Sequence, residues 1–442
     1  MRVPLWLASN RPRFWSWLWI LGCWAATWLE CRLMTDLRNY YGPYWSPVAV
    51  FAAAVLLCAC ALGFWLSRPL AEAAPARALG RTPLAGLLLL AGAVRVLFLQ
   101  TPLITAHPNT LAFSDVITIL QTYVARFRSG EVVYRYLTNL NYPLFPNHLP
   151  LQWLPYVPAD MLGIDYRWWS LGLLLLLGFG AYLLVLVRQP LPWPEFVLKA
   201  LLPFLVLAQL ISYTPDLYTF TCEPTIIAYY CLLAAAVLSR SALLQGVGLV
   251  LCLLSRYSVV FWVPFYLWVL WREMGLRHAL AVAGIVGAGI VGIYVIPFLS
   301  HDWTIFTHAL AEYKIATLGE WSHSDDSGRP PQLFNGVGAA SWFYTYGSGT
   351  LVEKIAALQR THVVACVAIM GLIAGLYYRL RHRLPYQIAA LLGLKLYLTV
   401  FYTFLQIPYL YLTSLGLFMS LFVALTVGFR VLEAPLPPPV AA

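Results

Sequence analysis

Charge is scarce in this sequence. Only 10% of its 442 residues are charged, whereas 61% are hydrophobic and the mean hydropathy is +0.73. A soluble domain keeps a surface rich in Lys, Arg, Asp and Glu, so this composition excludes that class. Several runs approach or exceed the ~20 apolar residues that a helix needs to cross a bilayer, and the run 169–187 has no charge at all. Because the alternating ten-residue segments of a membrane β-barrel are missing, we expect an all-α, polytopic transmembrane protein.

Signals for bound metals and nucleotides are missing as well. No CxxC pair or His/Cys cluster suggests zinc. Most of the eight cysteines fall in apolar runs, whereas Cys31 and Cys222 lie near a span boundary and could pair. The segment YGSGT at 346–350 lacks the lysine and the strand–helix setting of a phosphate-binding loop. We therefore expect no nucleotide cofactor and no metal site, although a divalent metal stays open.

The apolar runs predict ten full spans. No A-x-A-like site follows the first run, so we expect that run to be a membrane helix and not a removable signal peptide. The predicted spans lie near 14–30, 47–66, 84–100, 169–187, 195–212, 222–239, 279–299, 361–378, 384–404 and 409–430.

One further segment, between Arg240 and Arg272, is divided by Arg256 into two apolar stretches, 241–255 and 257–271. Each stretch would make a helix of about 22 Å, which is short of a ~30 Å hydrocarbon core. The pair is therefore one kinked helix or a shallow hairpin with Arg256 at its tip. The hairpin keeps the RLRHR cluster on the inner side, as the positive-inside rule requires, so we favour it.

This topology places both termini in the cytoplasm and most acidic residues on the outer face of the cell (inner or cytoplasmic) membrane. The net charge of +10 then reflects contact with anionic membrane lipids, and we expect no nucleic acid partner. Two outer loops are long, at 101–167 and 300–360, and loops of this length are usually functional or disordered. The first is too rich in aromatics and proline to be disordered, which favours short interfacial helices. In the second, 349–360 is expected to form a short amphipathic helix.

Polar residues of the first outer loop follow a recognisable order. Asp115 comes soon after a span, SGEVVY follows at 129–134, and NYPLFPNHLP follows at 141–150. Together with the many apolar helices and the basic-tipped hairpin, this order resembles the GT-C glycosyltransferases, and among them the bacterial polyprenyl-phosphate-mannose-dependent mannosyltransferases. That family has an acid in its first large extracytoplasmic loop, then a Gly-x-x-x-Tyr-like element and a Tyr-Pro-rich stretch. The matching positions here are Asp115, Gly130, Tyr134 and Tyr142-Pro143.

The resemblance covers residues 84–300 and implies four regions. They are an N-terminal two-helix extension (1–83), a GT-C-like catalytic core (84–300), a second outer loop (301–360) and C-terminal transmembrane helices (361–442). The order of spans departs from the family, because two spans precede the acidic loop and one is usual. The earlier outer segment 34–45 has an acid of its own, Asp36. Asp36 is therefore the alternative to Asp115.

The resemblance implies an inverting transfer of a sugar, mannose first of all, from a polyprenyl-phosphate donor to a hydroxyl of a glycolipid or glycan acceptor. Asp115 would be the general base, and cations would stabilise the leaving lipid phosphate. The expected phosphate ligands are Arg256 first, then Lys314, Lys395, His301 and His323, with Arg329 and His308 also considered. The expected acceptor or sugar cleft consists of Tyr134, Tyr142, His148, Trp153, Asp216 and Glu223.

Plainer interpretations stand beside these. Asp115 could cap the helix 116–128, Arg256 could mark a helix end, and Lys395 could snorkel or pair. Three other functions compete with the transferase. They are a transporter or flippase of lipid-linked glycans, which predicts ionisable residues near the bilayer midplane, a polymerase or ligase of such glycans, and a non-catalytic scaffold.

Overall fold

The computed structural model of this protein describes residues 5–67, 80–111, 113–140, 142, 144–189 and 191–428, and side chains from Leu18 onward except that of Asp216. Within these ranges the fold is all-helical, and the only β-type pairing is an isolated bridge between Leu137 and Leu144. This confirms the predicted fold class at the level of a helical protein.

The helices follow one another along the chain. In chain order they are α1 (Leu5–Leu33), α2 (Leu37–Leu66), α3 (Arg81–Ala106), α4 (Asp115–Arg128), α5 (Pro150–Trp153), α6 (Val157–Met161), α7 (Tyr166–Leu173), α8 (Gly180–Val187), α9 (Trp193–Tyr213), α10 (Asp216–Thr219), α11 (Glu223–Val237), α12 (Ala242–Leu253), α13 (Trp262–Met274), α14 (Leu276–Ile290), α15 (Ile305–Ser322), α16 (Pro331–Phe334), α17 (Ala340–Tyr346), α18 (Leu351–Leu380), α19 (Tyr386–Thr403) and α20 (Leu410–Thr426). Short π-helical segments join α7 to α8 and extend α14 to Leu299. Two long stretches of short helices and loops interrupt the series, between α3 and α7 and between α14 and α18.

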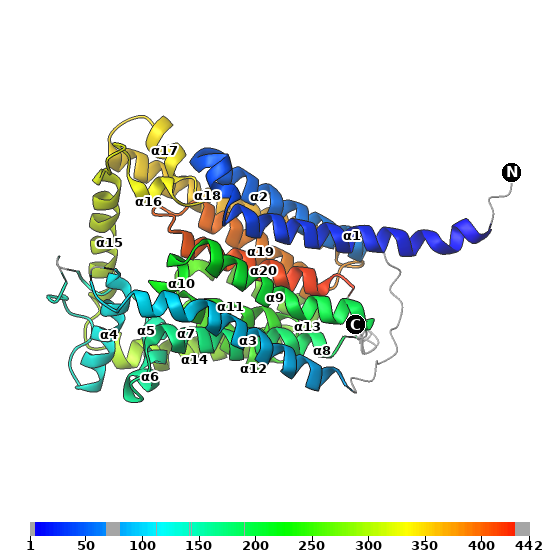
Figure 1. Ribbon diagram of the computed structural model, residues 1–442, viewed down its shortest axis with the longest axis horizontal. Helices are drawn as coiled ribbons and strands as arrows, with labels where there is room; N and C mark the ends of the chain where they lie inside the picture. Colours follow the sequence, from blue (N-terminus) through cyan, green and yellow to red (C-terminus); the bar gives the residue numbers. More distant parts are fainter. Residues whose placement is uncertain are drawn as a thin grey trace.

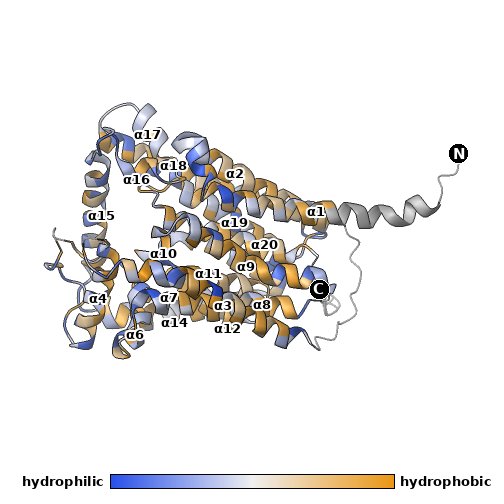
Figure 2. Cartoon of the chain, in the orientation of Figure 1, coloured by the Kyte–Doolittle hydropathy of each residue, from blue (hydrophilic) through white to orange (hydrophobic). Residues whose placement is uncertain are grey.

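Six of the described helical segments are long and apolar enough to cross a membrane, which makes the chain a multi-pass membrane protein. They are Leu37–Leu66, Arg81–Ala106, Tyr166–Val187, Trp193–Tyr213, Leu276–Leu299 and Leu351–Leu380. Each matches one of the ten predicted spans. Predicted spans 222–239 and 409–430 correspond to the shorter apolar helices α11 and α20. Figure 2 shows hydrophobic residues along the body of the bundle and more hydrophilic ones near α4, α15 and α16.

The small helices gather at one end of the bundle, here called the loop end. Figure 1 shows α4, α5, α6, α15, α16 and α17 at this end, with α8 near the opposite one. The predicted short helices of the first loop are present as α4, α5 and α6. Residues 349–360 do not form a separate helix, because they are the first part of the 30-residue α18. Its start is fixed by a capping box, in which Thr350 accepts from the Glu353 amide and the Glu353 carboxylate accepts from the Thr350 amide.

The core of the bundle consists of α11, α19 and α20, which are buried along nearly all of their length. The N-terminal pair α1–α2 packs directly on α19 and α20, so it is part of this bundle and not a separate unit. Arg256 lies between α12 and α13, as expected for the tip of a hairpin, and α14 packs against both arms. The hairpin tip therefore meets the start of α11 near the loop end.

Candidate functional site

Asp115 opens α4 and points to a neighbouring segment of the first loop. Ser114 occupies the N-cap position and donates its hydroxyl hydrogen to the Phe220 carbonyl at 2.6 Å, which ties the start of α4 to the segment before α11. Asp115 is thus the first helical residue and not the cap. Its Oδ2 accepts a hydrogen bond from the Tyr142 hydroxyl. The Tyr142 hydroxyl therefore orients the Asp115 side chain.

Asp36 has a different environment. Both of its carboxylate oxygens accept hydrogen bonds from the Arg32 guanidinium, one turn earlier, and Thr35 donates a third at 3.0 Å. The Arg32 guanidinium, together with Thr35, holds the pKa of Asp36 well below its usual range. A carboxylate whose pKa is so low is a poor proton acceptor, so the geometry favours Asp115 over Asp36 as a base.

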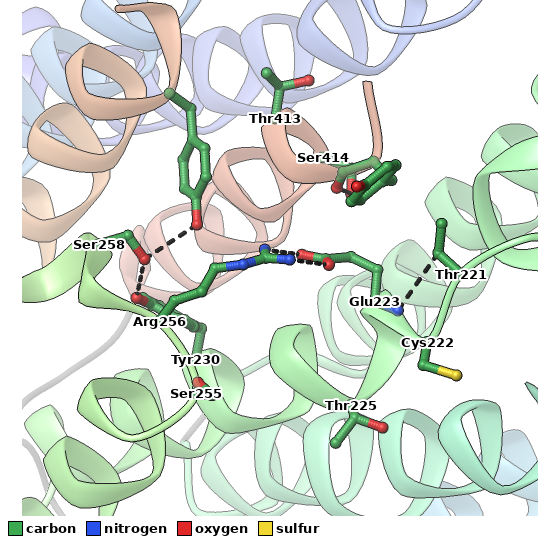
Figure 3. Close-up of polar contacts among 12 residues, drawn as sticks. Thr221, Cys222, Glu223, Thr225, Tyr230, Ser255, Arg256, Ser258, Thr413 and Ser414 are labelled. Atoms are coloured by element: carbon green, nitrogen blue, oxygen red, sulfur yellow. Dashed lines mark hydrogen bonds and ion pairs between the residues drawn. The ribbon is translucent and has the colours of Figure 1, made fainter. Parts of the chain in front are cut away.

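Glu223 and Arg256 form the central ion pair of the loop end. Glu223 is the first residue of α11, and Arg256 has extended backbone between the hairpin arms. The guanidinium donates to both carboxylate oxygens, at 2.5 and 2.6 Å, and the side chains are only 16% and 2% exposed. Figure 3 shows the two side chains meeting end to end, with Thr413 and Ser414 of α20 on one side of the pair. Such two-point pairing is strong and directional.

A polar chain continues from this pair to α19. Ser258, two residues after Arg256, shares a hydrogen bond with Tyr230 at 2.6 Å and accepts one from the Tyr402 hydroxyl at 3.1 Å. The Ser258 end of this chain is visible in Figure 3 beside Arg256. Tyr402 also interacts with Arg256 itself. Glu223 of α11 and Tyr402 of α19 therefore both act on a single guanidinium.

Two tyrosines at the start of α20, Tyr409 and Tyr411, lie within electrostatic range of Asp115. The Tyr411 hydroxyl interacts electrostatically with Arg256, Glu223 and Asp115. The neighbouring Tyr409 stacks on Tyr411 with ring centroids 5.4 Å apart. All three charged groups therefore lie within electrostatic range of one tyrosine at the loop end. This is the observation that unites the two parts of the site.

Helix α15 crosses the loop end beside this region. At one end Tyr136 donates to Glu312 at 2.7 Å, which joins α15 to the first loop. At the other, Tyr409 donates to Glu320 at 3.1 Å and the Trp321 indole donates to the Gln406 carbonyl at 2.9 Å. Figure 1 shows α15 bridging the two halves of the loop end. The site thus has a helical cover built from the second loop.

His148 is a second predicted cleft residue, after Glu223, that lies near Arg256. Its Nδ1 is 3.1 Å from the Tyr123 hydroxyl, while its carbonyl accepts from Tyr134 at 3.0 Å. Burial, with a smaller effect of Arg256, lowers the pKa of His148 to about 4, so the ring is neutral at physiological pH. Trp153 is completely buried, and its indole donates to Tyr134 at 3.4 Å. Tyr134 therefore holds the backbone of His148, and Trp153 holds Tyr134. Neither buried ring lines a cleft.

The remaining predicted site residues are exposed, make other contacts or are not described. Lys314, His301 and His323 are exposed on α15 or just outside it. Arg329 stacks over Phe334 at 5.4 Å, and His308 packs against Phe145. The side chain of Asp216 lies outside the described residues. Lys395 is fully buried within α19, where it pairs with Glu30.

The structure thus pairs Tyr142 with Asp115 and Glu223 with Arg256, and it places His148 near Arg256. The contributions of Tyr402, Tyr409, Tyr411, Ser258 and Glu320 were not expected from the sequence. The only available signal was the pair of tyrosines in PYLYLT (408–413), at the start of an apolar helix. Their partners lie far away in the chain. Glu223 and Arg256 were expected to bind different substrates, whereas the structure joins them to each other.

An apolar groove of about 640 Å³ opens on the side of the bundle. Pro47 and Phe51 of α2, Trp342 of α17, Leu372 of α18 and Phe404, which caps α19, contribute to its walls. This groove lies on the other side of α19 from Tyr402, because Val400 and Phe404 are about half a turn from Tyr402. Its size and apolar lining suit a hydrocarbon chain.

Among the described residues, no group of three or more His, Cys, Asp or Glu side chains could hold a metal ion. All eight cysteines are free, including Cys31 and Cys222. Comparisons of the chain with protein-family models, with curated proteins and with solved structures find no match.

Proposed function

We propose that this protein is a GT-C-type membrane glycosyltransferase. It moves a sugar, mannose first of all, from a polyprenyl-phosphate donor to a hydroxyl of a glycolipid or glycan acceptor. In this proposal the loop end is the extracytoplasmic face of the cytoplasmic membrane, and both termini are cytoplasmic. The observation that supports the proposal is that Asp115, held by Tyr142, and the Glu223–Arg256 pair both lie within electrostatic range of Tyr411. A carboxylate base and a cation for phosphate are the two groups that such a transfer needs.

The chemistry follows from these two groups. The acceptor hydroxyl gives its proton to Asp115 while its oxygen bonds to the anomeric carbon of the sugar. The bond from that carbon to the phosphate oxygen breaks, and its electron pair leaves with the lipid phosphate on the opposite face, which inverts the configuration. Tyr142 orients the Asp115 carboxylate for this step. No nucleotide takes part.

Arg256 retains donors for the leaving phosphate. A guanidinium carries five N–H groups in a fixed fork, and Glu223 takes up only two of them through its bidentate contact. Glu223 therefore orients the Arg256 guanidinium, and this role replaces the one expected for it in the acceptor cleft. The Tyr409 and Tyr411 rings replace Tyr134 and Trp153 as the aromatic surface available to a sugar.

Sugar transfer by the full chain in lipid tests the proposal, with radiolabelled polyprenyl-phosphate mannose and a panel of glycolipid acceptors. Asp115→Asn is expected to lower the rate by at least about 10²-fold, as for loss of a general base. Asp36→Asn is the matched control, because its carboxylate is already held by Arg32, and it is expected to keep the rate. Loss of activity only in Asp36→Asn would instead assign the role of base to Asp36, in the turn between α1 and α2. A wild type inactive with mannosyl, glucosyl and arabinosyl donors would overturn the proposal.

A transporter of lipid-linked glycans is the second candidate, and one observation favours it. Glu30 and Lys395 are a fully buried ion pair within the helical bundle, and intramembrane charges of this kind are frequent in transport pathways. Movement of a labelled lipid-linked sugar across proteoliposomes, without transfer to any acceptor, would support this candidate. A polymerase or ligase of lipid-linked glycans would use the same base and phosphate site and would differ in its acceptor.

A further inference from the structure

The Glu30–Lys395 pair connects three helices at a depth where charges are costly. The Lys395 ammonium on α19 contacts Glu30 Oε1 on α1 and donates to the Gly416 carbonyl of α20 at 3.0 Å. The second Glu30 oxygen accepts from the Ser420 hydroxyl of α20 at 2.5 Å. Both charged side chains are at most 1% exposed. A buried pair so completely hydrogen-bonded holds its helices in one relative rotation, because any other rotation would leave a charge without a partner.

The same face of α19 reaches the candidate active site. Tyr402 follows Lys395 by seven residues, so it lies on the same side of the helix about two turns, or ~10 Å, further toward the loop end. Thr399 lies between them and is buried. A cavity of about 10 Å³ on this face is lined by Glu30, Thr399 and Tyr402 among others. The ion pair and Tyr402 are thus neighbours along one continuous polar face.

Rotation of α19 decides where the Tyr402 hydroxyl lies. In the structure this hydroxyl donates to Ser258 at 3.1 Å and interacts with Arg256. Ser258 belongs to the short turn that presents Arg256 to Glu223. A turn of α19 about its axis would carry Tyr402 away from Ser258 and leave the hairpin tip without this contact.

We propose that Glu30 and Lys395 are positioning residues for the Arg256 site, acting through the rotation of α19 and Tyr402. This inference rests on the proposed function and deepens it, since it makes the N-terminal helices part of the catalytic unit. It also gives Lys395 a role other than phosphate binding.

The test compares variants of the full chain in lipid with two readouts. One is kcat for sugar transfer per folded protein, and the other is hydrogen exchange of residues 255–260, which does not depend on activity. Lys395→Met is expected to lower kcat about 10- to 100-fold, as displacement of a catalytic group does, and to speed exchange at 255–260. Ser420→Ala keeps both charges and is expected to change both readouts in the same direction but less, so it replaces Lys395→Met if that variant fails to fold.

A second buried pair provides the matched control. Glu195 and Lys199 lie 2.8 Å apart on α9, beside the end of α20 that is remote from Arg256. Glu195→Gln is expected to lower thermal stability while leaving kcat and exchange at 255–260 unchanged. If Lys395→Met behaves like Glu195→Gln, the pair only stabilises the bundle and the inference is overturned.

The double variant Glu30→Gln/Lys395→Met separates stability from positioning. Removing both charges relieves the buried unpaired charge, so thermal stability is expected to recover toward that of the wild type. The kcat should remain low because α19 has lost its anchor, and a kcat that recovers together with stability would contradict the inference. If the wild type transfers no sugar, the proposed function fails, while hydrogen exchange still decides whether the pair positions the hairpin tip.

Discussion

Arg256 and Glu223, 33 residues apart in the chain, close a two-point ion pair where the hairpin tip meets the start of α11. Neither residue can be replaced alone without leaving the other charge in a largely buried position. The pair therefore fixes the hairpin against the core and at the same time presents the guanidinium to the loop end. Its energetic and catalytic contributions can be separated by substitution.

Arg256→Met is expected to lower the free energy of unfolding by about 3–5 kcal/mol, because it leaves the Glu223 carboxylate buried without a partner. The double variant Arg256→Met/Glu223→Leu should regain most of this loss but transfer no sugar. Thermal unfolding in detergent, together with the transfer assay, measures both effects. The exposed pair Arg135–Glu131 provides a control, since Arg135→Met should cost less than about 1 kcal/mol. Equal losses in the two single variants would contradict this account of the pair.

Tyr142→Phe is expected to lower kcat for transfer about 10- to 100-fold, because a hydrogen bond to a charged group is worth about 1.5–3 kcal/mol. Burial and the Asp115 carboxylate raise the pKa of Tyr142 above its ordinary value, so the phenol stays protonated and donates. Stability should change little, since the side chain is 44% exposed. Tyr136→Phe removes a similar bond, to Glu312, and should leave kcat unchanged. A Tyr142→Phe enzyme with wild-type kcat would show that Asp115 needs no such orientation.

His148 should make the protein less stable as the pH falls from 6.5 toward 4. Its pKa is about 4 in the folded protein and near 6.5 when exposed, so the unfolded chain binds the proton first over this range. At pH 4.5 the loss is about 2 kcal/mol, after a discount for the partial exposure of the ring. Denaturation midpoints at several pH values measure it. The slope should diminish in His148→Gln and persist in the exposed-site variant His323→Gln; an unchanged slope in His148→Gln would assign the effect to other groups.

Filling the apolar groove should impair use of a long lipid chain. Ala365 lines the groove on α18, and Ala365→Phe would exclude two or three carbons of a bound chain, which raises the KM for a long-chain donor about 10-fold. A short-chain donor analogue should retain its KM. Val364→Phe is the matched control, because Val364 is 67% exposed on another face of the same helix. Equal behaviour of the two variants would show that the groove holds no substrate lipid.

Local patterns were sufficient for the helical framework. The charge-free run 169–187 and its counterparts predicted helices because, without water, a lipid-exposed backbone must satisfy its own hydrogen bonds. Arg256 between two short apolar stretches predicted the hairpin for a similar local reason. Even the start of α4 next to Asp115 could be anticipated from the Ser-Asp pair. The length of α18 could not be anticipated, because its first turns are polar and therefore predicted a separate short helix before the apolar span 361–378.

The site needed the tertiary structure. Sequence reasoning selected Asp115, Tyr142, His148, Glu223 and Arg256 one at a time, but it had no means of pairing Glu223 with Arg256 or of adding Tyr402 and Tyr411. These contacts cross between helices far apart in the chain, and helix packing alone fixes them. The same holds for Lys395. Its ammonium group suits a phosphate ligand, but in the structure it is buried and paired with Glu30.

The sequence by itself determined that this protein is a bundle of membrane helices, because hydropathy and backbone hydrogen bonding are local properties that each segment carries with it. Only the tertiary structure decided which charges neutralise each other and which remain available for chemistry. Glu30 meets Lys395 across a sequence separation of 365 residues, and its partner could have been any cation in the chain. Burial forces each charge to find a partner, but the packing of α1, α11, α19 and α20 chooses which one.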